Sequence, residues 1–197
     1  MGNQSGGNTS TPRAIAELEE FLIAAINGDE KAFEMIWKSL NPRISKYVAS
    51  QSYGSGIDYE EVVSETWISV ARGISKFDGE FPQFKSWVYS IARNRIVDAV
   101  RKGNRQVKSG GEISEFEFED SKSKVDSGIE SDESVKEIVK KIKKLPEAQA
   151  EVIMLRIVGD LDVNEVARAL NKSENAVRVL CSRGLETLRG ELKEGRS

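Results

Sequence analysis

Residues 160–189 read DLDVNEVARALNKSENAVRVLCSRGLETLR, and the pattern within them specifies how the C-terminal part of the chain folds. Asp162 is followed three residues later by Glu165, a capping-box pattern that begins a short helix. The connector 171–173 is brief, and Ser173 can cap a second, longer helix that is rich in basic residues. Two helices joined in this way predict a helix-turn-helix.

Upstream of this motif, apolar residues recur at helical spacing in several segments. Those between Ile15 and Ile26 share one face, and the sequence NGD at 27–29 ends that helix and caps the next one. Asn41-Pro42 predicts that a further helix begins there, because proline is favoured in the first turn. No long stretch alternates with period two, so the expected fold class is all-α.

Two segments without this periodicity divide the chain into two small helical domains. Residues 1–13 are rich in glycine, serine, asparagine and threonine, and we expect them to form a disordered tail. Residues 106–131 hold seven acidic residues and three lysines, the composition of a flexible acidic linker. Within that linker, 115–120 (EFEFED) alternates and could pair as a short strand. The expected helical domains are therefore 14–105 and 132–193.

The composition of the 197 residues excludes several classes of site. The chain has no histidine, which rules out a Ser-His-Asp triad and histidine-ligated metals. Its one cysteine, Cys181, rules out an internal disulfide and a zinc site of several thiolates, and it suits a reducing cytoplasm. We expect Cys181 to be a small buried residue rather than a redox sensor. No apolar run approaches the ~20 residues that span a bilayer, so we expect no membrane insertion.

The formal net charge of −3 conceals an uneven distribution along the chain. Residues 58–65 carry four acids and no base, whereas 85–105 carry six bases and one acid. Residues 168–189, which include the second helix of the helix-turn-helix, carry five bases and two acids. Charge runs are common on solvated helices, but two basic helices, one in each domain, favour contact with nucleic acid, whose phosphates supply much of the affinity.

Four motifs, in order along the chain, resemble those of the bacterial RNA polymerase sigma factors, and most closely the extracytoplasmic-function (ECF) group. They are 58–67 (DYEEVVSETW), 84–94 (FKSWVYSIARN), 145–156 (LPEAQAEVIMLR) and 159–167 (GDLDVNEVA). The likeness extends over about residues 15–193. The sequence departs from the family pattern at Ser64, Ala71, Asn171-Lys172 and Gly184.

The resemblance implies a protein that is not an enzyme and that needs no cofactor or metal. It would bind RNA polymerase core, recognise the minus-ten and minus-thirty-five promoter elements, and help to open the DNA strands. The implied contacts on core are the coiled coil of the largest subunit and the flap region, and an anti-sigma factor is a further partner to consider. A solvated acidic helix start is the simpler interpretation of the carboxylates at the expected core-binding site. The residues of that site are Asp58, Glu61, Ser64, Glu65 and Ile68.

The predicted helix that follows residue 84 combines aromatic and basic side chains. Opening a duplex requires both, because unpaired bases stack on rings and cations hold the separated strand. By the resemblance, Asn94 matches a position that reads a flipped-out base, and the connector 78–83 would help to form its pocket. Core packing is the alternative role for Trp87, which adjoins the apolar stripe. The expected minus-ten and melting residues are Lys85, Trp87, Tyr89, Arg93, Asn94, Arg101, Lys102 and Arg105.

The second helix of the helix-turn-helix would read the minus-thirty-five element. Residues near the N-terminus of such a helix reach base edges in the major groove. Arg178 can donate two hydrogen bonds to guanine, and Asn175 could pair with adenine or with a phosphate. The residues expected to contact this element are Lys172, Ser173, Asn175, Arg178, Ser182 and Arg183.

Two functions of other classes stay open. Asp58, Glu61 and Glu65 share a helix face and could hold Mg²⁺ in a metal-dependent nuclease. Alternatively, a helix-turn-helix transcriptional regulator could bind DNA without polymerase core.

Overall fold

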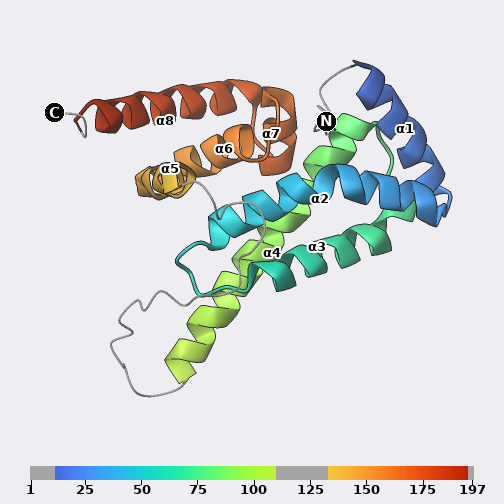
Figure 1. Ribbon diagram of the computed structural model, residues 1–197, viewed down its shortest axis with the longest axis horizontal. Coiled ribbons are helices and arrows are strands. Elements are labelled where there is room, and N and C mark those ends of the chain that lie inside the picture. The colour runs from blue at the N-terminus through green and yellow to red at the C-terminus, as the bar shows by residue number, and fades with distance from the viewer. Residues whose placement is uncertain (1–11, 110–132, 195–197) are drawn as a thin grey trace, which may run out of the picture.

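Residues 12–109 and 133–194 are described by the structure, a computed structural model, and every regular element in these ranges is helical. The all-α prediction is therefore confirmed. The helices form two groups along the chain (Figure 1). The N-terminal group contains α1 (Pro12–Ile26), α2 (Glu30–Ser52), α3 (Tyr59–Gly73), the short 3-10 helix η1 (Ile74–Lys76) and α4 (Phe81–Ser109). The C-terminal group contains α5 (Glu133–Lys144), α6 (Glu147–Ile157), α7 (Val163–Leu170) and α8 (Glu174–Glu194).

The segments expected to be tail and linker lie mostly outside the described residues. So does the stretch 115–120, which could pair as a strand. Two edges of these segments are described and helical, because α1 begins at Pro12 and α4 continues to Ser109.

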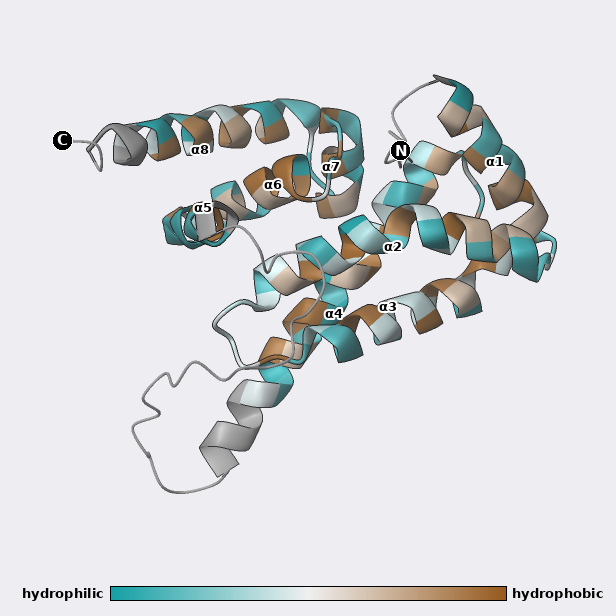
Figure 2. Cartoon of the chain, in the orientation of Figure 1, coloured by the Kyte–Doolittle hydropathy of each residue, from teal (hydrophilic) through white to brown (hydrophobic). Residues whose placement is uncertain are grey.

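Helix α2 supplies the central stripe of the N-terminal group. Ile36, Leu40, Ile44 and Tyr47 recur every three or four residues, and all four are buried. They pack against apolar side chains of α1, α3 and α4, so the hydrophobic faces of these helices turn inward (Figure 2). The stripe holds α3 and α4 at fixed positions beside α2.

The prediction that a new helix begins at Asn41-Pro42 is wrong. Pro42 lies inside α2, which continues without interruption from Glu30 to Ser52. A proline within a helix removes one backbone hydrogen bond and disfavours the helix. Here the buried stripe runs through this position, with Leu40 before it and Ile44 after it, and its burial outweighs the local preference for a break.

The connector predicted at 78–83 is shorter than expected, because α4 begins at Phe81 with Pro82 in its first turn. The caps predicted at Asp29 and Asp162 agree with the structure. Asp29 caps α2 by accepting from the backbone N–H of Lys31 (2.8 Å) and Ala32 (3.1 Å). The capping box of α7 is complete, because Asp162 and Glu165 each accept from the other's backbone N–H at 2.7 Å.

The helix-turn-helix is formed by α7 and α8. Asn171 ends α7 in the left-handed conformation, with φ of 51°, and the Ser173 hydroxyl accepts from the N–H of Ala176 to cap α8. Gly184 lets α8 approach α6 closely, since a Cβ there would lie 3.0 Å from Cγ1 of Ile153. This contact gives a packing reason for the glycine.

Among the described residues, none of the helices combines the length and the apolar character that a membrane span requires.

Candidate nucleic-acid and protein interfaces

The residues expected to bind polymerase core lie together on one side of α3. Glu61, Ser64, Glu65 and Ile68 are all exposed, and Ile68 leaves 49% of its surface accessible. Asp58 precedes them as the helix cap and accepts from the N–H of Glu60 and Glu61. The arrangement is an acidic edge around one apolar side chain, which fits a basic protein surface with an apolar contact.

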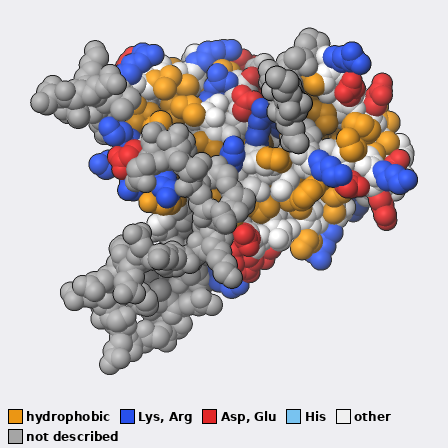
Figure 3. Space-filling model, in the orientation of Figure 1, with side chains coloured by type: hydrophobic (Ala, Val, Ile, Leu, Met, Phe, Trp, Pro, Cys, Tyr) orange, Lys and Arg blue, Asp and Glu red, His pale blue; other side chains and the backbone are white. Residues whose placement is uncertain are grey.

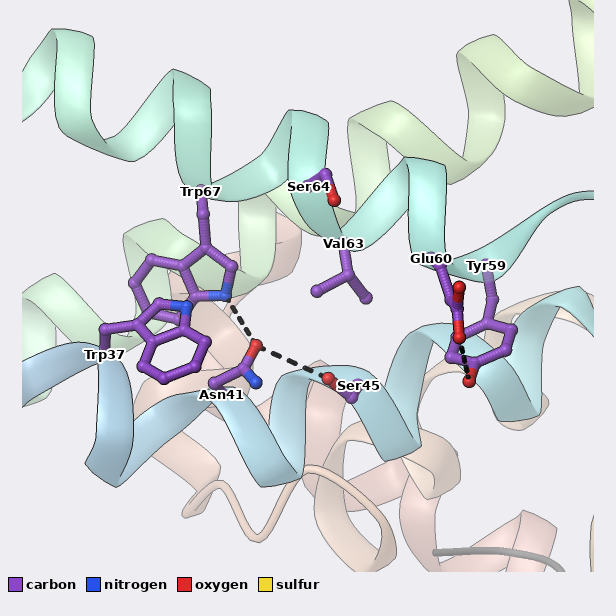
Figure 4. A pocket seen from close by; sticks show the side chains of 8 residues that line it. All are labelled: Trp37, Asn41, Ser45, Tyr59, Glu60, Val63, Ser64 and Trp67. Carbon is purple, nitrogen blue, oxygen red and sulfur yellow. Dashed lines mark hydrogen bonds between the residues drawn. The ribbon is translucent and has the colours of Figure 1, made fainter. Parts of the chain in front are cut away.

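A groove of about 380 Å³ runs beside this face, between α2 and α3 (Figure 4). Trp67 lies at one end of the groove and donates from Nε1 to Oδ1 of Asn41 at 2.9 Å. Tyr59 lies at the other end and donates to Glu60 at 3.1 Å. Its lining residues are Trp37, Asn41, Ser45, Tyr59, Glu60, Val63, Ser64 and Trp67.

The sequence interpretation missed the apolar surface that α2 contributes next to this groove. Trp37, which lines the groove, is 38% exposed, and Figure 3 shows hydrophobic side chains on the surface over α1, α2 and α3. Trp37 follows Ile36 in an apolar stretch, so periodicity alone could not tell that it lies outside the core. Sequence held no signal that separates Trp37 from Ile36, because neighbouring residues can share the buried face of a helix, as Tyr47 and Val48 do in α2.

All six residues expected to read the minus-thirty-five element are exposed, at the turn and along the first part of α8. Val177 is buried in their midst and anchors this part of the helix to the core. Arg178 donates to the carboxylate of Glu174 at 2.6 Å. The amide nitrogen of Asn164, in the orientation that satisfies both groups, donates to the same carboxylate at 2.9 Å. Glu174 thus joins the two helices of the motif and holds Arg178 along α8.

The residues expected on α4 divide into an exposed set and a covered set. Asn94, Arg101 and Lys102 are exposed toward the C-terminal half of the helix, and Lys102 lies 3.9 Å from Glu61 of α3. The side chain of Arg105 lies outside the described part of the chain.

Trp87 has a packing role in an aromatic cluster. Its ring centroid lies 5.4 Å from that of Phe77 and 5.7 Å from that of Phe84. A Cβ on Gly73 would lie 2.9 Å from the indole, so α3 and α4 meet tightly here. Trp87 nevertheless keeps part of its surface accessible.

Lys85, Tyr89 and Arg93 face the C-terminal group. Lys85 Nζ lies 2.9 Å from Glu165, and both side chains are largely buried, at 12% and 8% exposure. Arg93 forms an ion pair with Glu151, and that hydrogen bond raises the pKa of Arg93.

Tyr89 is the most deeply covered of these residues. It is 1% exposed, and its hydroxyl donates to the carbonyl of Gly159 at 2.9 Å. Burial raises the pKa of the Tyr89 phenol, so its hydroxyl stays protonated as a donor.

Two further contacts join the helical groups. Arg43 of α2 lies 3.0 Å from the carboxylate of Asp160. Lys143 of α5 donates to the carbonyls of Gln51 (2.9 Å) and Tyr53 (2.5 Å), and its partial burial lowers its pKa. Local sequence patterns could not indicate these contacts, since the partners are separated by about a hundred residues.

The nuclease alternative needs several converging metal ligands. Within the described ranges, no group of three or more acidic or cysteine side chains is placed to hold a metal ion.

Family comparisons match both helical groups. Residues 37–106 match the model for sigma-70 region 2, and residues 136–188 match the model for sigma-70 region 4. Together the two ranges span more than half of the chain.

Relatives similar over most of the chain carry the same description. The chain is 25% identical over 178 residues to the ECF RNA polymerase sigma factor SigD of Mycobacterium tuberculosis, covering 89% of this chain and 84% of that protein. It is 27% identical over 174 residues to the ECF RNA polymerase sigma factor SigW of Bacillus subtilis, covering 85% and 92%.

Two solved structures share the fold. CnrH, in complex with the cytosolic domain of CnrY, superposes with a TM-score of 0.64 at 19% identity, covering 90% of this chain and 98% of that one. The sigma factor RpoE, in complex with the anti-sigma factor NepR from Bartonella quintana, gives 0.63 at 19% identity, covering 83% and 98%.

Proposed function

The chain belongs to the extracytoplasmic-function sigma factors of RNA polymerase, and we propose that α3 binds polymerase core while α4 and α8 contact promoter DNA. As a member of this family it directs promoter-specific transcription initiation, and the polymerase supplies the catalysis. The alternative of a regulator that works without polymerase is not favoured.

One observation carries the assignment of roles. The region 2 match falls on the N-terminal helices and the region 4 match on the C-terminal helices, and each group presents its own exposed basic residues. We propose the N-terminal group, 14–105, for core binding, melting and the minus-ten element. We propose the C-terminal group, 132–193, for the minus-thirty-five element.

A protein regulator is part of the proposal. CnrH and RpoE were each solved bound to another protein, and RpoE to an anti-sigma factor. The exposed ring of Trp37, which lines the groove beside the acidic face of α3, supports such a partner for this chain. We infer that the protein acts in the cytoplasm, where polymerase and promoter DNA are found.

The direct test mixes the full chain with polymerase core and a library of promoter fragments. We expect the chain to co-elute with core and to yield transcripts from defined start sites. Core alone is the control. Failure to form the complex, together with no start-site-specific transcript, would contradict the proposal.

A second test separates recognition from melting. Asn94→Ala should impair strand opening in the minus-ten element, measured by the fluorescence of 2-aminopurine placed there, with little change in duplex binding. Arg101→Ala is the matched control, since loss of a phosphate contact weakens binding for all sequences and reduces the slope of log affinity against log salt by about 1. Equal opening by the wild type and Asn94→Ala would remove Asn94 from the melting site.

A further inference from the structure

Val179 is an exposed apolar residue on α8, among the polar and basic residues proposed to contact the minus-thirty-five element. Its side chain leaves 41% of its surface accessible. We propose that Val179 contacts the C5-methyl group of a thymine in that element and thereby selects an A·T pair at one position. This inference rests on the proposed DNA-binding role of α8, to which it adds a hydrophobic contact.

The geometry of α8 turns Val179 away from the core. Val177, Gly184 and Leu188 form the buried side of this helix. Successive residues of an α-helix are rotated by about 100°, so Val179 points about 200° away from Val177, nearly opposite the buried side. A side chain in this direction faces the base edges when the helix enters the major groove.

The neighbours of Val179 on this side of the helix are residues proposed to read DNA. Asn175 and Arg183 lie four residues before and after it, Ser182 lies three residues after it, and all three are exposed. The stretch 175–183 contains no acidic residue that would repel phosphates. Val179 therefore lies in the middle of the proposed DNA-reading side.

Helix propensity does not favour a valine at this exposed position. A β-branched side chain lowers helix propensity, and single apolar residues on a surface need no partner. In a helix, however, valine has one strongly preferred χ1 rotamer, which holds its two methyl groups in a fixed direction. Such a stiff side chain loses little conformational freedom when it contacts a ligand, so Val179 is well suited to touch a methyl group.

The major groove offers a partner of matching chemistry. Each thymine presents a C5-methyl group there, and apolar side chains contact it. The six residues already proposed to read the element end in polar or charged groups. Among residues 172–183, all of them described, Val179 is the only apolar residue that is exposed. It therefore supplies the apolar contact that the other six lack.

The test removes the methyl group from the DNA. Holoenzyme, formed from the full chain and polymerase core, is titrated into fluorescent fragments of a promoter selected with the wild type. In each fragment one thymine of the minus-thirty-five element, on either strand, is replaced by deoxyuridine, which lacks only the methyl group. We expect the wild type to lose about fourfold in affinity at one thymine, the effect of one methyl-sized apolar group.

Substitutions of Val179 remove or keep the other side of the contact. Val179→Ala should bind the unmodified promoter about fourfold more weakly than the wild type and show no further loss with deoxyuridine at that position. Alanine is the better helix former, so this variant should stay folded. Val179→Ile keeps the β-branch and should keep the response to deoxyuridine.

Ile157→Ala is the matched control. Ile157 is an exposed apolar residue of the same helical group, at the end of α6 and outside the residues proposed to contact DNA. Its variant should respond to deoxyuridine as the wild type does.

Two results overturn the proposal. Equal affinity of the wild type for the unmodified fragment and for every deoxyuridine fragment would show that no thymine methyl group is contacted. An equal loss in the wild type and in Val179→Ala would show that the methyl group acts through another residue or through the shape of the DNA.

A fragment with a scrambled minus-thirty-five element separates this inference from the proposed function. If wild-type holoenzyme binds that fragment as tightly as the selected promoter, the proposed role of α8 fails and this inference fails with it. If the holoenzyme prefers the selected promoter but is indifferent to thymine methyl groups, only the contact of Val179 is refuted.

Discussion

At the start of α8, Arg178 is held by Glu174 in an exposed ion pair that Asn164 also joins. Exposed pairs of this kind contribute at most ~1 kcal/mol, so the pair orients Arg178 without preventing it from reaching a base. This geometry gives Arg178 a defined position before its proposed contact with DNA.

Replacing Arg178 with alanine should relax the preference at one base position of the minus-thirty-five element. The expected loss of discrimination is ~1–3 kcal/mol, the contribution of one bidentate contact to guanine. The measurement is holoenzyme binding to promoters in which each position of the element is varied. Arg189→Ala, an exposed position farther along α8, is the control. A loss that is equal at all positions would identify Arg178 as a phosphate contact instead.

Tyr89 should make the stability of the fold sensitive to alkaline pH. Burial raises its pKa in the folded chain, whereas in the unfolded chain the phenol ionises near pH 10. Above about pH 10 the unfolded state therefore binds fewer protons, and the free energy of unfolding falls as pH rises. Below this range the group is neutral in both states and has no effect.

The variant Tyr89→Phe tests this effect. At pH 7 it should lower the free energy of unfolding by about 1 kcal/mol, because the hydrogen bond to Gly159 is lost. As pH rises past about 10, the difference from the wild type should shrink, since the variant lacks the ionisable group. Urea unfolding of both proteins at pH 7 and above pH 10 measures the difference in their free energies of unfolding at each pH. Parallel decline of both proteins would contradict the argument.

Among the helices, α2 illustrates how far local sequence rules extend. Caps depend on one to four neighbouring residues, so Asp29, Asp162 and Asn171 could be predicted correctly from sequence. Pro42 could not, because its place inside α2 depends on side chains of α1, α3 and α4 that cover the stripe on either side of it.

Replacing Pro42 with alanine should stabilise α2. Pro42 is exposed, and alanine restores a backbone N–H and has a higher helix propensity by ~3 kcal/mol in a helix interior. We expect a rise of about 1 kcal/mol or more in the free energy of unfolding, measured with urea. Lys46→Ala, another exposed position on α2, is the control. A loss of stability in Pro42→Ala alone would mean that the proline ring makes packing contacts that alanine cannot replace.

Helix α4 shows a different limit. Its composition predicted a basic and aromatic helix, and Asn94, Arg101 and Lys102 are indeed exposed. The burial of Lys85 and Tyr89 could not be predicted, because their partners lie about 70 residues away along the chain. Nothing in the spacing of α4 distinguishes a cation that faces solvent from one that faces a carboxylate of another helical group.

Across the whole molecule, the net charge of −3 does not show how acidic and basic residues are distributed over the surface. Three acidic side chains of α3 (Glu60, Glu61 and Glu65) are exposed, and the exposed residues at the start of α8 are mostly polar or basic, while some of the opposing charges meet between the groups. The two helical groups are thus joined by electrostatics as well as by apolar packing.

A double-mutant cycle on Lys85→Met and Glu165→Gln should reveal strong coupling between the groups. Both side chains are largely buried, so removing one partner leaves a charge without compensation. We expect an interaction energy above ~1 kcal/mol from urea unfolding of the four proteins. The exposed pair Lys38–Glu34 within α2 is the comparison, with an expected value of ~0.3–0.5 kcal/mol. Equal values for the two pairs would show that Lys85 and Glu165 are solvated in solution.

The exposure of all six residues proposed to read the minus-thirty-five element, at the turn and along the first part of α8, has an evolutionary consequence. Val177 packs in the core, and Gly184 lets the following turns of α8 pack against Ile153. The residues that attach the helix to the core are therefore different from the exposed side chains that would face DNA. Surface substitutions away from packed positions usually change stability by no more than about 0.5 kcal/mol. If these positions read DNA as proposed, they can diversify after gene duplication, and copies of the protein can acquire new sets of target genes while the scaffold stays unchanged.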